Sequence, residues 1–314
     1  AEAPAPEPAP APKAEFNIVP TLALAETTPD LGADSGAAWT VFKANPDGSR
    51  GEYVSTDYGA WKGNLEVGKY VISAKIDHAE VEQPVTIEDG KVAEPHFVLN
   101  AGTLVVRPRP SPGADINSGA AVNVKYAGDG DTTSYGETKA VFPAGDLTLS
   151  VKIGEGEVVE TFALKAGETI EKDVIVGVGH VVTNAFYVPG MKVDDGGLAV
   201  NILKAAKKID GSREDVAYAY GPDSKFDLPP GDYVLVGKLD QAVAEAPFTV
   251  KSGERVEATV VLNAGVLAIT ATGATFNEVF GATKDIQGNR KAFGYAYSEA
   301  HQTTLPAGDY VVVA

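Results

Sequence analysis

Aromatic side chains at strand spacing are the strongest candidates for ligand contact in this chain. Tyr218 and Tyr220 stand two residues apart, as do Tyr295 and Tyr297, and Trp61 is a further candidate. Alternate residues of a strand share one face, so such rings could form a strip on which a sugar stacks. The same spacing is more typical of tyrosines that pack in a core or on a sheet face. The four tyrosines are therefore possible ligand contacts, secondary to a packing role.

Residue types that catalyse reactions in other proteins are scattered here. Four histidines fall at unrelated positions, without the spacing of a zinc site or a catalytic triad: His78, His96, His180 and His301. Neither a Gly-x-Ser-x-Gly nucleophile motif nor a phosphate-binding Gly-Lys-Ser/Thr motif occurs. The sequence predicts no catalytic residue and no cofactor, and hence a protein that is not an enzyme.

Three short acidic stretches could offer carboxylates to calcium. They are Asp47-Gly48, Asp129-Gly-Asp131 and Asp194-Asp195-Gly-Gly. No complete calcium-loop spacing follows any of them, and aspartate beside glycine is typical of ordinary turns. We therefore expect turns at these positions and no metal site.

The composition excludes several classes of partner. The 314 residues carry a net charge of −17, whereas a nucleic-acid-binding surface is basic. No apolar run approaches the roughly 18 residues of a membrane-spanning helix. The chain has no cysteine, which removes disulfides and thiolate metal sites and suits an extracytoplasmic setting, in the periplasm or at the cell surface.

A repeated turn-and-strand stretch organises the chain, and it is clearest in Leu228-Pro-Pro-Gly-Asp-Tyr233. An anchor glycine recurs at Gly68, Gly145, Gly231 and Gly308. A second glycine follows 22 residues later in three copies, at Gly90, Gly167 and Gly253, and a third follows after 34 residues, at Gly102, Gly179 and Gly265. Glycines at fixed offsets are a strong signal of an internal repeat.

The repeat unit is built from turns and short strands. Proline fixes φ near its turn value, and the anchor glycine is expected to adopt a positive φ. The residues after it alternate, so we expect a buried face that includes Trp39, Tyr70, Leu147, Tyr233 and Tyr310. Short strands separated by turns at regular spacing predict an all-β fold of tandem Ig-like or prealbumin-like β-sandwich repeats.

We divide the chain into a tail and four repeats. Residues 1–15 form an Ala/Pro-rich linker or tail, expected as an extended spacer. The repeats are 16–101, 102–178, 179–264 with an insertion near 188–197 or 207–215, and an incomplete repeat at 265–314. Almost no linker separates them, which predicts a stiff rod. We expect the natural chain to continue past Ala314; alternatively, the open edge of repeat four takes a strand from a second copy and builds a filament.

These motifs resemble those of bacterial tandem Ig-like repeats of the carboxypeptidase-regulatory or prealbumin-like kind. The Leu-Pro-Pro-Gly-Asp-Tyr stretch is similar to the turn and strand of PEGA-type and Cna-B-type modules. Val260-Val-Leu-Asn-Ala-Gly265 resembles repeats found beside von Willebrand factor A domains in proteobacterial extracytoplasmic proteins. The resemblance implies a fold for residues 16–314 but no particular activity.

Cna-B modules can crosslink an asparagine at a strand end to a lysine, which makes Asn100 and Asn263 worth testing. That crosslink needs a lysine on the first strand, and Leu104-Val-Val and Val181-Val-Thr carry none. We expect both asparagines to cap turns instead.

The sequence thus predicts a non-enzymatic extracytoplasmic protein with a structural, scaffolding or adhesive role. A protein or cell-envelope partner is expected, with self-association through the incomplete repeat as an option. The alternatives are a glycan- or peptide-binding module and an accessory region of a larger surface protein. Nucleic acid and a membrane span are not expected.

Overall fold

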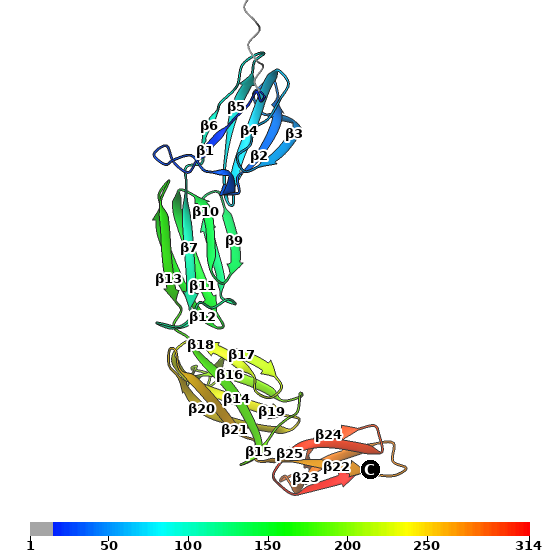
Figure 1. Ribbon diagram of the computed structural model, residues 1–314. Coiled ribbons are helices and arrows are strands. Elements are labelled where there is room, and N and C mark those ends of the chain that lie inside the picture. Colours follow the sequence, from blue (N-terminus) through cyan, green and yellow to red (C-terminus); the bar gives the residue numbers. More distant parts are fainter. Residues whose placement is uncertain (1–14) are drawn as a thin grey trace, which may run out of the picture. The chain divides into compact units, whose positions relative to one another are not determined.

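The computed structural model describes residues 15–314 and forms an all-β protein. Eight small sheets are present in the described chain, two for each repeat, so the predicted tandem β-sandwich fold is confirmed (Figure 1). The Ala/Pro-rich spacer predicted for residues 1–15 lies outside the described residues except for Glu15. The rod-like arrangement, the limits of the repeats and the continuation past Ala314 stay predictions.

Repeat one pairs a four-stranded sheet, β3-β2-β4-β5, with the two parallel strands β1 and β6. Its elements are β1 (Thr21–Ala23), the 3-10 helix η1 (Ala33–Ser35), β2 (Ala38–Ala44), β3 (Arg50–Tyr58), β4 (Gly68–Ile76), β5 (Ala79–Ile87) and β6 (His96–Val98). In repeat two the sheets are β12-β11-β8-β9 and β10-β7-β13. Its strands are β7 (Ala101–Arg109), β8 (Ala121–Tyr126), β9 (Gly130–Tyr135), β10 (Thr138–Pro143), β11 (Gly145–Ile153), β12 (Gly156–Leu164) and β13 (Thr169–Ile175).

Repeat three has the same plan, with β17-β16-β19-β20 facing a sheet centred on β14. Its strands are β14 (Gly179–Val188), β15 (Met191–Lys192), β16 (Ala199–Lys207), β17 (Arg213–Tyr220), β18 (Lys225–Leu228), β19 (Gly231–Leu239), β20 (Ala242–Val250) and β21 (Arg255–Val261). Strand β15 lies within the expected insertion at 188–197 and pairs with β14. Repeat four contains β22 (Ala264–Thr270), β23 (Asn277–Lys284), β24 (Arg290–Ala296), β25 (Ala300–Pro306) and β26 (Tyr310–Val313), in the sheets β22-β25 and β24-β23-β26.

By its contacts the chain divides into two compact units whose border runs through repeat two. The first takes in the described chain up to Arg107, with Ala121–Ser150 and Val159–Asp173. The second takes in Pro108–Ala120, Val151–Val158 and Val174–Ala314. In the first unit, the core is built around the buried Trp39, whose ring packs edge-on against Phe97 with ring centroids 5.3 Å apart. In the second, Tyr233 and Leu235 are buried among the aliphatic side chains of both sheets of repeat three. No helix among the described residues is long and apolar enough to cross a bilayer.

In three of the four repeats, a tyrosine two residues after the anchor glycine closes the turn that leads into the following strand. The hydroxyl of Tyr70 donates to the carbonyl of Glu66 at 2.9 Å, and that of Tyr233 donates to the carbonyl of Pro229 at 2.9 Å. Tyr310 donates in the same way to Pro306, at 2.6 Å. This is the arrangement known as a tyrosine corner. Burial raises the pKa of the Tyr70 and Tyr310 phenols, so both remain donors at neutral pH.

The predicted buried residues are confirmed with one exception. Trp39, Tyr70, Leu147 and Tyr233 are buried, whereas Tyr310 is only half-buried. Leu147 occupies the tyrosine position in repeat two and is fully buried, so a hydrophobic side chain replaces the corner there. Repeat four has fewer strands over Tyr310 than repeat three has over Tyr233, which explains the difference.

The expected reason for the anchor glycine is wrong in two repeats. Gly145 does adopt a positive φ, of +145°, but Gly68 and Gly308 do not. At those two positions a Cβ would instead contact the ring of the corner tyrosine, at 3.7 Å from the Tyr70 ring and 3.6 Å from the Tyr310 hydroxyl. These are ordinary van der Waals distances, so neither the φ angle nor a clash requires glycine at Gly68 or Gly308.

The third glycine has a clearer steric reason, because a turn packs directly on it. A Cβ on Gly102 would lie 2.7 Å from the carbonyl oxygen of Lys165 and 2.8 Å from that of Glu168. The second glycine of the repeat, Gly167, is in that turn at φ +77°, and its N–H donates to the carbonyl of Ala101 at 2.8 Å. The third glycine of repeat one is therefore packed by the turn that carries the second glycine of repeat two.

Replacing Tyr233 with Phe should lower the free energy of unfolding by about 1–2 kcal/mol, because the partly buried carbonyl of Pro229 loses its donor. Tyr233→Ala should cost on the order of 3 kcal/mol, through the cavity it leaves. The control is Tyr218→Phe, whose side chain is 75% exposed and which should change stability by less than about 0.5 kcal/mol. Urea unfolding measures all three, and equal effects at Tyr233 and Tyr218 would contradict the corner.

Replacing Gly102 with Ala should destabilise the protein by about 1–3 kcal/mol, because the new methyl group meets two backbone carbonyls that cannot turn aside. Gly265 is the matched control, since no atom lies within 4 Å of a Cβ built there. Gly265→Ala should be neutral or slightly stabilising. Thermal unfolding of the two variants tests this, and the explanation fails if Gly102→Ala is as stable as the parent.

Candidate functional site

The structure places the four predicted tyrosines on the outside of the sheets. Tyr218, Tyr220, Tyr295 and Tyr297 are exposed by 75%, 70%, 61% and 79%. Of the two packing roles expected for them, packing in the core is wrong, whereas the structure does place them on sheet faces, where Tyr218 packs on Tyr220 and Tyr295 packs on Tyr297. Along β17, the small side chains of Ala217 and Ala219 are the ones that face inward, because Tyr218 and Tyr220 occupy the alternate, outer positions.

An exposed tyrosine occurs at the corresponding position of every repeat. Tyr58 of β3 pairs with Ala38, Tyr135 of β9 pairs with Ala121, and Tyr220 pairs with Ala199. Tyr297 packs on Phe276 instead, with ring centroids 5.2 Å apart. Tyr58 and Tyr135 are 76% and 70% exposed.

Sequence reasoning missed Tyr58 and Tyr135. Each stands one residue closer to its anchor glycine than Tyr220 and Tyr297 do, so a strict offset does not find them. Strands β3, β9 and β17 each end in tyrosine, and Tyr297 directly follows β24, so a tyrosine at the end of this strand is the signal that could have found them. Trp61, the other aromatic candidate, is buried and packs on Trp39 at 6.3 Å, so it belongs to the core.

A register shift in the β16–β17 hairpin brings two polar groups together beside the tyrosines. Ile202 pairs with Ala217, but the next pair is Leu203 with Asp215, so Val216 is an extra residue. Such a bulge re-aims the side chains next to it. Val216 packs against the core, and Asp215 accepts a hydrogen bond from the Asn201 amide at 3.1 Å.

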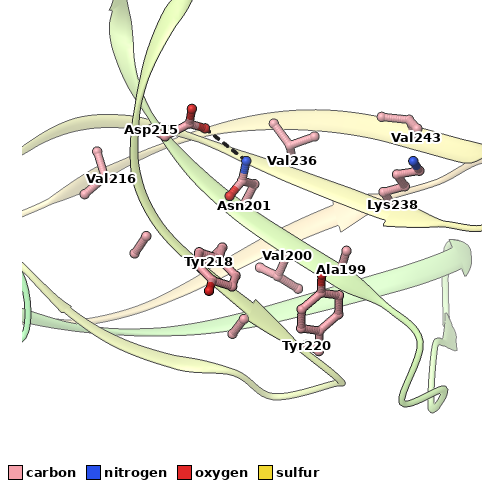
Figure 2. A pocket seen from close by; sticks show the side chains of 12 residues that line it. Ala199, Val200, Asn201, Asp215, Val216, Tyr218, Tyr220, Val236, Lys238 and Val243 are labelled. Carbon is pink, nitrogen blue, oxygen red and sulfur yellow. Dashed lines mark hydrogen bonds between the residues drawn. The ribbon is translucent and has the colours of Figure 1, made fainter.

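These side chains surround a hollow of about 580 Å³ on the outer face of the sheet (Figure 2). Tyr218 and Tyr220 lie on one side, with ring centroids 6.4 Å apart and rings nearly perpendicular. The other lining residues include Asn201, Asp215, Ala199, Val236, Lys238 and Val243. Hollows of this volume are typical of sites for small ligands.

A second hollow, of about 530 Å³, lies at the far end of the same two strands and is lined by charged side chains of both signs. They are Lys204, Lys207 and Lys208, together with Glu214 and Asp232. The Lys204 ammonium lies 4.7 Å from the centre of the Tyr233 ring and 3.2 Å from its hydroxyl, which fixes it at the corner. In a chain of net charge −17, three lysines this close together are a local exception.

The histidines make local contacts and do not form a catalytic group. His180 Nδ1 lies 3.0 Å from Asp227 Oδ1, and His301 Nδ1 lies 2.9 Å from the buried Asn277 Oδ1. The His78 ring stacks on Phe142, with centroids 4.8 Å apart. No group of three His, Cys, Asp or Glu side chains able to hold a metal ion is found between residues 15 and 314.

The acidic stretches and the strand-end asparagines form turns. Ser49 donates to Asp47 through both its backbone N–H, at 3.0 Å, and its hydroxyl, at 2.6 Å. These hydrogen bonds hold the pKa of Asp47 below its ordinary value. Asn100 and Asn263 adopt the left-handed conformation, with φ of +50° and +48°, as expected of residues that end a strand in a turn.

No family model matches the chain, and no curated protein matches it. Among solved structures, it is similar to the TIE protein of Bacillus anthracis, at 14% identity and a TM-score of 0.25, over 94% of this chain and 67% of that one. A streptococcal ancillary pilin matches at 12% identity and a TM-score of 0.27, over 77% and 98%. The major pilin subunit BcpA of Bacillus cereus matches at 12% identity and a TM-score of 0.21, over 78% and 97%. Likenesses at this level carry no argument about function.

Proposed function

We propose that this chain is a non-enzymatic structural or adhesion protein of the extracytoplasmic space, in which tandem β-sandwich repeats act as spacers. The observation that carries the proposal is a contact that joins consecutive repeats in the same way at two places. A protein that holds a fixed spacing needs defined contacts between its repeats, since an open linker leaves them independent.

The first of these contacts joins repeats one and two, within the first compact unit. The tight turn between β4 and β5 places Asp77 at φ +47°. Asp77 Oδ2 accepts a hydrogen bond from the backbone N–H of Val141 at 2.8 Å, and the N–H of His78 donates to the carbonyl of Val141 at 3.1 Å. Val141 lies on β10, an edge strand, so the turn covers backbone groups that a sheet edge otherwise exposes.

The same contact joins repeats three and four, within the second compact unit. Asp240, at φ +48°, begins the turn between β19 and β20. Its Oδ2 accepts from the N–H of Thr304 at 2.7 Å, and the N–H of Gln241 donates to the carbonyl of Thr304 at 3.2 Å. Between repeats two and three, Gly154 stands in the place of the aspartate, and one backbone bond remains, from Glu155 N–H to Asp227 O at 2.9 Å.

The exposed surfaces suit a role in contacts rather than in catalysis. His180 and Asp47 are engaged in a local pair and a turn, as set out above, and the chain has no cysteine. A protein or cell-envelope partner is the expected contact. Self-association through repeat four is part of the same proposal.

A second candidate function is ligand binding by repeat three. The observation that favours it is the hollow beside Tyr218 and Tyr220, which combines exposed rings with an amide, a carboxylate and an ammonium group. This candidate adds a ligand-binding surface to the structural role. If the chain is an accessory region of a larger surface protein, the same face of repeat three would bind the ligand for that protein.

Replacing Asp77 or Asp240 with Ala should lower the free energy of unfolding by about 1 kcal/mol each, because a backbone N–H loses its acceptor. Asp89→Ala is the control, since Asp89 is an exposed turn residue outside these contacts. Its effect should be below about 0.5 kcal/mol. Urea unfolding measures the three variants, and an unchanged midpoint for both Asp77→Ala and Asp240→Ala would remove the main support for the structural role.

The extracytoplasmic location is checked by fractionating cells that produce the protein from its natural gene. The protein should appear in the periplasmic or surface fraction, together with a marker of that compartment. Its recovery with a cytoplasmic marker would contradict the proposed location.

A further inference from the structure

Three residues lie in one row across the outer face of the main sheet in repeat one and again in repeat three. In repeat three, Ala199 of β16 pairs with Tyr220 on one side and with Lys238 on the other. In repeat one, Ala38 pairs with Tyr58 and with Lys75 in the same way. The backbone positions of the tyrosine and the lysine therefore lie about 10 Å apart, which is two strand spacings. The methyl group of the alanine lies between them.

The two rows differ at the next strand. In repeat one, Lys75 faces Glu80, whose carboxylate also accepts from Arg50 and Ser73. In repeat three, Lys238 faces Val243. No carboxylate lies within ion-pair distance of the Lys238 ammonium in residues 15–314, whereas Glu80 places a carboxylate on the strand beside Lys75. Repeat three therefore presents an unneutralised cation beside an exposed ring.

The surroundings of Lys238 extend this pattern. On one side, the Asn201 and Asp215 oxygens are hydrogen-bond acceptors able to take the hydroxyl groups of a ligand. Repeat three thus combines an aromatic surface, acceptors for hydroxyl groups and the ammonium group of Lys238 on one face.

We infer that this face of repeat three binds an acidic saccharide, with a sugar ring on Tyr220 and its carboxylate on Lys238. The inference rests on the second candidate function and names its ligand class. A pyranose ring has an apolar face that stacks on an aromatic side chain, and a uronate carries its carboxylate at the ring edge. The charge of Lys238 selects against a neutral sugar, because the ammonium group is then covered without a partner.

A peptide fits this face less well. Extended peptides bind by pairing with a sheet edge, and helical peptides bind in an apolar groove. The hollow lies over the middle strands β16 and β19 and the side chains of β17, where the backbone groups of the central strands are already paired. A ligand that needs only stacking, hydroxyl acceptors and one cation is the better match.

The test is isothermal titration of the full chain with β-1,4-linked hexaglucuronate, with cellohexaose as the neutral probe of the same backbone. The uronate should bind at least about tenfold more tightly than cellohexaose, and more weakly as salt is raised. Lys238→Met and Val243→Glu should each weaken uronate binding at least about tenfold. The first removes the ammonium group, and the second places a carboxylate opposite Lys238 that pairs with it. Tyr220→Ala should weaken binding of both probes.

Lys75→Met is the matched control, because it removes the equivalent lysine of repeat one and should leave affinity within about twofold. Val243 is 53% exposed, so Val243→Glu is expected to fold, and its urea unfolding curve verifies this. The inference is overturned if the uronate does not bind, if cellohexaose binds equally well, or if Lys238→Met binds like the parent. It is also overturned if hexaglutamate binds as tightly as the uronate, which would assign the face to an acidic peptide. None of these results affects the structural role, which depends on the Asp77 and Asp240 contacts.

Discussion

The architecture of this protein depends on how each repeat closes the turn that leads into its central strand. A buried tyrosine hydroxyl satisfies a carbonyl four residues upstream, and the ring lies across the anchor glycine. That contact fixes where the central strand starts, and the central strand carries the tight turn that reaches the next repeat. Asp77 and Asp240 both lie at the far ends of strands that begin at an anchor glycine. The spacing between a corner and a junction is therefore the same in repeats one and three.

The same strands divide the two faces of the sheet between folding and contact. The inner face is aliphatic and buried, whereas the outer face carries an exposed tyrosine in each repeat. Repeats can keep the inner face and change the outer one at little cost in stability, because exposed substitutions usually have small effects. Lys75 of repeat one faces Glu80, whereas Lys238 of repeat three faces Val243, and this difference is such a change. A scaffold with one specialised repeat is a natural result of this separation.

Much of the fold follows from sequence, because turn residues and alternation are local signals. Fixed glycine offsets predicted the repeats, and Tyr233 and Leu147 were correctly predicted as buried. The sequence left open whether Tyr218 and Tyr220 pack in the core or lie on a sheet face, since alternation gives the period of a strand but not which of its faces points inward. Alanines fill the inner positions of β17, and nothing local signals that choice. The role of Lys238 was also beyond sequence reasoning, because it depends on the identity of a residue on a neighbouring strand.

Hydrogen exchange at the edge strands tests most directly whether consecutive repeats are joined as described. The amides of Val141 and Thr304 point away from their own sheets and are covered only by Asp77 and Asp240 of the preceding repeat. Lys139 and Gln302, two residues earlier on the same edges, serve as internal references. The account predicts that Val141 and Thr304 exchange far more slowly than Lys139 and Gln302. Equal, fast exchange at all four amides would contradict it, because the repeats would then be linked by the chain alone.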